Sequence, residues 1–163
     1  MLTATLTVGL LGLVFGQSNR NPTPEPKFSE LSKDDCARLE RQRAVVAAAA
    51  RRSGTASLTG TKSDLPVLQR LIDDKVFKKS QTYELQCLGV AFGDVLTSEL
   101  PLRWVMVTDE YGTDPTLRFK KTTIQINALT MISKRVEREE HVDVAELLRR
   151  IHEQLVQPGK TGD

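Results

Sequence analysis

The sequence predicts an α+β fold with amino-terminal helices, a small antiparallel three-stranded sheet and a carboxy-terminal helix. Three observations lead to this class. Apolar side chains recur at helical spacing over residues 33–99. Residues 103–127 instead contain β-branched and alternating segments separated by turn residues. Helical spacing returns after residue 129, so the sheet lies between two helical regions of the chain.

The first predicted helix begins after Ser32, which can cap it, and Asp35 stands where a side chain reaches back to the cap. Gly54 ends this helix. Arg43 interrupts its apolar face. The residues of that face are Cys36, Leu39, Val46, Ala47 and Ala50.

Two further helices are predicted before the sheet. Pro66 is placed in the first turn of the second, where its missing N–H costs nothing. The third covers roughly residues 80–99 and carries Gly89 and Gly93 four positions apart, on one face. This spacing predicts that another element packs very close to that face.

Three strands are predicted at residues 103–108, 116–120 and 122–127. The short connection at Lys120 and Lys121 predicts that the last two strands form an antiparallel hairpin. A short helical segment follows at 129–135. Asp143 is a good N-cap for the final helix, with Glu146 three residues later.

The chain divides into four segments. Residues 1–16 contain no charged side chain and fit the apolar region of a signal peptide, residues 17–31 form a Pro-rich tether, residues 32–157 form a single α+β domain, and residues 158–163 are a flexible tail. We therefore expect an exported protein, periplasmic or secreted. The alternative is a cytoplasmic protein with a wrongly assigned start.

Composition narrows the range of partners. The net charge is only +2 and aromatic residues make up 5% of the chain, which does not favour nucleic-acid binding. The apolar run at residues 1–16 is too short for a stable membrane span, which needs about 20 residues.

Two cysteines, Cys36 and Cys87, leave two interpretations open. In an oxidising compartment they can form a disulfide. Alternatively, both are separate small residues of the core, since each lies on the apolar face of a predicted helix. Together with two distant histidines they lack the spacing of a zinc site, and no metal or other cofactor is predicted.

An ordered set of segments resembles an uncharacterised bacterial family, the domain-of-unknown-function family 3806. The segments are LGVAFGD at 88–94, WVMV at 104–107, DEYGTDP at 109–115, LTMISKR at 129–135 and VDV at 142–144. The resemblance implies a small bacterial α+β domain. It implies no catalytic residue.

The acidic turn with Asp109, Glu110 and Asp114 is the most site-like cluster, and Trp104 and Tyr111 are its aromatic neighbours. One interpretation is a protein-binding surface made by these five residues. A second is that Asp109 and Asp114 brace their own turn through side-chain hydrogen bonds. A third is a divalent cation held by the three carboxylates.

Asp94 lies among apolar neighbours and is predicted to form a partly buried ion pair with Lys134 or Arg135. The alternative is an acid–base pair that binds a ligand. No catalytic residues are predicted, since the sequence contains no nucleophile elbow, P-loop, GxGxxG or HExxH.

These observations favour a non-enzymatic, exported protein-binding or accessory module whose partner is another protein. The alternative is a small ligand- or metal-binding protein or a hydrolase. Its carboxylate site would lie around Asp94, Asp109 and Glu110.

Overall fold

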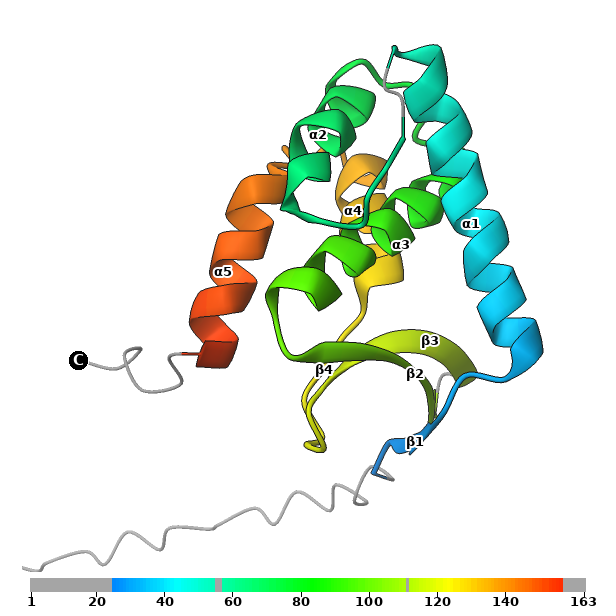
Figure 1. Ribbon diagram of the computed structural model, residues 1–163, viewed down its shortest axis with the longest axis vertical. Coiled ribbons are helices and arrows are strands. Elements are labelled where there is room, and N and C mark those ends of the chain that lie inside the picture. Colours follow the sequence, from blue (N-terminus) through cyan, green and yellow to red (C-terminus); the bar gives the residue numbers. More distant parts are fainter. Residues whose placement is uncertain (1–24, 55–56, 111, 157–163) are drawn as a thin grey trace, which may run out of the picture.

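A four-stranded antiparallel sheet lies against a layer of five α-helices in the residues that the computed structural model describes, 25–54, 57–110 and 112–156 (Figure 1). The fold is therefore α+β, as predicted. The predicted signal peptide, residues 17–24 of the tether, and the tail lie outside the described residues. Within the described ranges, no helix combines the length and apolar character needed to cross a membrane.

The helices begin and end close to the predicted positions. They are α1 (Lys33–Arg52), α2 (Leu65–Asp73), α3 (Thr82–Glu99), α4 (Ala128–Glu137) and α5 (Val144–Val156), with a short 3-10 helix at Lys62–Asp64. The Ser32 hydroxyl accepts a hydrogen bond from the Asp35 N–H at 3.1 Å, and the Asp35 carboxylate accepts one from the Ser32 N–H at 2.9 Å. Asp143 caps α5 by accepting from the Glu146 N–H at 2.9 Å. The capping residues thus set both helix starts.

Helix α3 occupies the centre of the helical layer, and its glycines make close packing possible. A Cβ on Gly89 would lie 2.4 Å from the carbonyl oxygen of Ala128, at the start of α4. A Cβ on Gly93 would lie 2.4 Å from the ring of Trp104. The prediction that another element packs very close to this face is confirmed, with α4 at one glycine and the sheet at the other.

The sheet has the order β1–β2–β3–β4, with strands Lys27–Ser29, Leu102–Asp109, Gly112–Phe119 and Gln125–Ile126. The predicted meander of three strands is present as β2, β3 and β4. The third of these is shorter than expected, because only Gln125 and Ile126 pair with β3.

The fourth strand, β1, lies within the segment predicted to be a tether. Phe28 pairs opposite Val107 on β2, and the Arg118 guanidinium lies 4.2 Å from the centre of the Phe28 ring. Alternating prolines predict extended backbone, and extended backbone next to prolines is compatible with an edge strand. The sequence pattern therefore indicated the conformation of these residues but not their pairing.

Candidate functional site

The tip of the β2–β3 hairpin carries the acidic residues predicted as a binding surface. Glu110 and Asp114 are exposed, Asp109 is partly buried, and Tyr111 lies outside the described residues. The Asp114 carboxylate lies 3.6 Å from the Arg38 guanidinium of α1; the Asp114 side chain is largely in solvent and the Arg38 side chain is partly exposed. Thr108 and Thr113 share a hydrogen bond of 2.9 Å between their hydroxyls just below the tip.

Trp104 faces the helices instead of joining the hairpin tip. It lies five residues before Asp109 on β2, about 17 Å along an extended strand. Its indole N–H donates to Asp94 Oδ1 at 3.0 Å. Trp104 is therefore a structural residue between sheet and helices, and the predicted grouping of Trp104 with the acidic turn is wrong.

Asp94 forms an ion pair, but its partner is Arg43 and neither Lys134 nor Arg135. Arg43 Nε donates to Asp94 Oδ2 at 2.7 Å, and Arg43 Nη2 donates to Asp94 Oδ1 at 2.9 Å. This two-pronged contact is the strong geometry for an arginine–carboxylate pair. The hydrogen bond to Asp94 raises the pKa of Arg43.

The two predicted cations have other surroundings. Arg135 donates from Nη1 to the Met131 carbonyl at 2.6 Å, one turn back along α4. Lys134 is exposed. The sequence did contain a signal for the true partner: Arg43 interrupts an apolar helix face, and a charged residue in such a position needs a partner.

The structure does not assemble the carboxylate site of the alternative hypothesis. The Asp94 carboxylate already accepts three hydrogen bonds from Arg43 and Trp104. Asp109 and Glu110 lie at the far end of β2, away from it. Over residues 25–54, 57–110 and 112–156, no three His, Cys, Asp or Glu side chains gather in a way that could hold a metal ion.

The two cysteines carry free thiols in the structure, so the possible disulfide between them is not formed. Cys87 is buried, and burial raises the pKa of its thiol to about 11. Cys36 is exposed, which corrects the expectation that it belongs to the core. It lies in the first turn of α1, and the first buried residue of that helix is Leu39.

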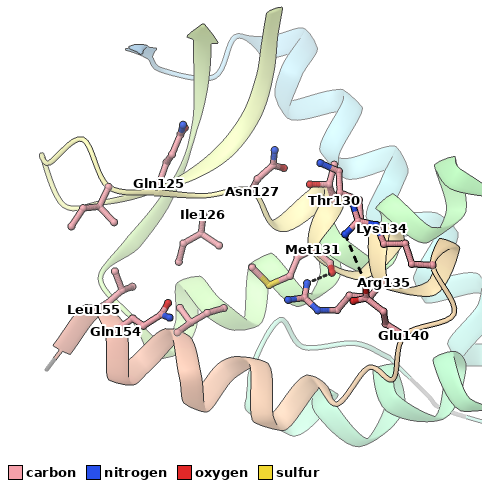
Figure 2. A pocket seen from close by; sticks show the side chains of 13 residues that line it. Gln125, Ile126, Asn127, Thr130, Met131, Lys134, Arg135, Glu140, Gln154 and Leu155 are labelled. Carbon is pink, nitrogen blue, oxygen red and sulfur yellow. Dashed lines mark hydrogen bonds and ion pairs between the residues drawn. The ribbon is translucent and has the colours of Figure 1, made fainter. Parts of the chain in front are cut away.

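A groove between β4, α4 and α5 is the feature that the sequence did not predict (Figure 2). Its volume is about 520 Å³. Ile126 from β4, Met131 from α4 and Leu155 from α5 surround the hollow with partly buried apolar side chains. Ile124 lines the same groove and is 49% exposed, an unusual position for a large apolar side chain in this chain.

Two cations of α4 and the cation at its C-cap line one wall of this groove. Lys134, Arg135 and Arg138 contribute three positive charges, and Glu140 is the lining carboxylate. Arg138 Nη1 lies 3.8 Å from Glu140 Oε1, and no ion pair of Lys134 occurs within the described residues. We call this feature the basic groove, defined by Ile124, Ile126, Met131, Leu155 and these three cations. The groove can bind a molecule that has an apolar side chain next to a negatively charged group.

The helical segment predicted at 129–135 contains both apolar and basic residues, but no groove was predicted beside it. Two spacings carried the missing signal. Lys134 and Arg138 are four residues apart, which puts both on one side of a helix. Ile124 and Ile126 are two apart, which puts both on one face of a strand. Only the tertiary fold shows that α5 forms the remaining wall of the groove.

The fold and these surfaces define a small α+β domain with a helical layer on one face of an antiparallel sheet. Within this class, residues 64–148 match the sequence model of a family described as a domain of unknown function, DUF3806. The match covers just over half of the chain, and the chain belongs to this family. The predicted resemblance is therefore confirmed.

Comparison with solved structures supports the fold. The chain resembles a protein from Bacteroides thetaiotaomicron VPI-5482 with a TM-score of 0.73 and 15% sequence identity. The similarity covers 83% of this chain and 50% of that protein, so the chain spans about half of its length. At this identity the likeness concerns the fold alone. None of the curated proteins matches the sequence.

Proposed function

We propose that this protein is a non-enzymatic, exported protein-binding module that binds its partner through the basic groove. The observation that carries the proposal is the half-exposed Ile124 in one groove with three cations from the carboxy-terminal end of α4 and its cap. An exposed apolar side chain next to a charged rim is typical of protein interaction sites. The hairpin tip, the surface first predicted, offers exposed carboxylates but lacks an apolar centre among the described residues.

The charges of the groove favour a particular kind of partner segment. Lys134, Arg135 and Arg138 outnumber the lining carboxylate Glu140. The partner segment is therefore acidic and carries an apolar side chain that fills the space between Ile126, Met131 and Leu155. The apolar contact supplies most of the affinity, and the charges set orientation and association rate.

Export rests on the sequence of residues 1–16, which is apolar and uncharged. The test is expression of the full chain in a diderm bacterium, followed by fractionation and mass measurement of the mature amino terminus. Cleavage near Gly16 together with recovery from the periplasm or medium supports export. An intact Met1 in the cytosolic fraction contradicts it.

The binding proposal is tested by placing a photo-crosslinking residue at position 124 in the full chain. We expect a crosslinked partner protein that is lost in the double variant Lys134→Glu, Arg138→Glu. A matched control, Lys33→Glu with Arg52→Glu, makes the same change in net charge on exposed residues of α1. Both double variants are checked for an unchanged melting temperature.

The outcomes separate groove binding from non-specific attraction. Loss of the crosslink in the α4 variant, with retention in the α1 variant, supports the proposal. Equal loss in both indicates that only net charge matters, which contradicts it. Retention in both, or a crosslink at position 110 of the hairpin tip that is as strong as the one at position 124, contradicts the basic groove as the binding surface.

A further inference from the structure

A second hollow lies where the end of α2, the start of α3 and the end of α4 meet, and it shares only Glu140 with the basic groove. Its volume is about 470 Å³. We call it the apolar pocket. The side chains of its walls are Leu71, Ile72, Phe77, Leu85, Leu88, Val136 and Val142.

The rim of the apolar pocket carries three lysines and two glutamates, an excess of one positive charge. Lys75, Lys78 and Lys79 all line it, from the segment that joins α2 to α3. Glu139 and Glu140 line the opposite side, after α4, and Glu139 Oε1 lies 2.6 Å from Lys79 Nζ. This hydrogen bond, with the charges of Lys79 and Lys75, lowers the pKa of Glu139. Lys75 and Lys78 form no ion pair within the described residues.

Two residues of this rim have an unusual backbone. Lys75 has φ of 50° and Glu139 has φ of 60°, in the left-handed region that glycine adopts most readily. Each follows the cap residue of its helix, and each N–H donates to a carbonyl in the last turn at 3.0 Å. Glycine is the common residue at this position after a helix. The chain instead has charged side chains at both positions, and both side chains lie at the mouth of the same pocket.

We propose that the apolar pocket binds a small amphiphilic carboxylate, a molecule with an apolar body and one negative charge, such as a medium-chain fatty acid. The apolar walls hold the body, because removing apolar surface from water is favourable. The carboxylate takes the place of the Glu139 carboxylate at Lys79 and lies within reach of Lys75. Glu139 thus competes with the ligand for Lys79 and occupies the lysine when the pocket is empty of ligand. This site goes beyond the proposed function and does not depend on a protein partner.

The competition predicts opposite effects for the two members of the ion pair. The probe is decanoate, kept below its micelle concentration, and binding to the full chain is measured by isothermal titration calorimetry. Lys79→Gln removes the cation and is expected to weaken decanoate binding at least tenfold. Glu139→Gln frees Lys79 and is expected to strengthen it severalfold. Lys62→Gln, at an exposed lysine in the 3-10 helix, is the matched control and is expected to leave binding unchanged.

Two matched probes test the charge and the apolar body. Decanol has the same chain without the charge, and decyltrimethylammonium carries the opposite charge; both are expected to bind at least tenfold more weakly than decanoate. Equal binding of decanol overturns the role of the lysines. Absence of decanoate binding overturns the proposal as a whole.

A purely structural ion pair gives a different pattern. In that case Lys79→Gln and Glu139→Gln both lower the melting temperature by similar amounts, and neither changes decanoate binding. This result overturns the proposal, as does weaker binding in Glu139→Gln. Crosslinking at position 124 is measured on the same variants, so failure of the pocket and failure of the basic groove are distinguishable.

Discussion

Two aspartates of neighbouring elements, Asp94 on α3 and Asp114 on β3, lie near opposite ends of β2 in opposite surroundings. Near Trp104, the side chain of Asp94 is 19% exposed and accepts hydrogen bonds at 2.7, 2.9 and 3.0 Å from two other elements. Beyond Asp109, the side chain of Asp114 is 63% exposed and its carboxylate lies 3.6 Å from the Arg38 guanidinium. The residue type is the same at both ends. Burial and the number of donors therefore decide which carboxylate stabilises the fold and which belongs to the surface.

Replacing Asp94 by Ala is expected to cause the largest loss of stability among these variants. The Trp104 indole would lose its acceptor and Arg43 would keep only the exposed Glu40, 3.2 Å from its Nη1, while both remain partly buried. The free energy of unfolding should fall by about 3 kcal/mol. Urea unfolding followed by circular dichroism measures this. A loss below about 1 kcal/mol, the value typical of an exposed pair, would remove the distinction between the two ends.

Gly93→Ala tests the packing of α3 against Trp104, next to the Asp94 ion pair. Its Cβ would lie 2.4 Å from the Trp104 ring and 3.2 Å from the Ala128 side chain. Overpacking of this kind lowers the free energy of unfolding by about 2 kcal/mol, whereas Gly→Ala inside an unhindered helix raises it by about 1 kcal/mol. Trp104 is the one tryptophan of the chain, so a red shift of its fluorescence reports its displacement. A stabilised variant with unchanged fluorescence would show that α3 can move away from the sheet.

The helices and the central hairpin could be predicted because their signals are local. Ser32 with Asp35, Pro66 in the first turn of α2, and the alternation within residues 116–120 each depend on neighbours in the chain. Gly89 and Gly93 also predicted a close contact, although not with which elements. The pairing of β1 could not be predicted, since Phe28 and Val107 are distant in sequence and a three-residue edge strand has no pattern of its own.

The candidate site was less accessible to sequence reasoning, because its residues come from elements whose arrangement is set by the core. Arg43 was visible as an interruption in an apolar face, but its partner Asp94 is 51 residues away. The basic groove likewise joins Ile124 on one side to Leu155 on the other. The acidic residues of the hairpin tip were easy to recognise because they are close together in sequence. Their closeness in sequence did not predict how deeply each is buried.

Gln42→Leu tests whether the interior near Arg43 tolerates fewer polar groups. Gln42 is fully buried, and neither polar atom of its side chain has a hydrogen-bond partner among the described residues. Replacing an unpaired buried amide by an apolar side chain of similar size should raise the free energy of unfolding by about 1 kcal/mol. Thermal and urea unfolding check the sign. A loss of stability would indicate that the amide forms a hydrogen bond in solution.

Asp114→Ala removes the exposed carboxylate and is expected to change the free energy of unfolding least. The pair with Arg38 is long and solvated, so its removal should change the free energy of unfolding by less than about 0.5 kcal/mol. Whatever effect remains should disappear in 0.5 M salt, because exposed charges are screened over a few ångströms there. Unfolding in low and high salt measures both. A salt-resistant loss above about 1 kcal/mol would mean that the tip is held as firmly as the Asp94 end, and that exposure is a poor guide to the role of a carboxylate in this fold.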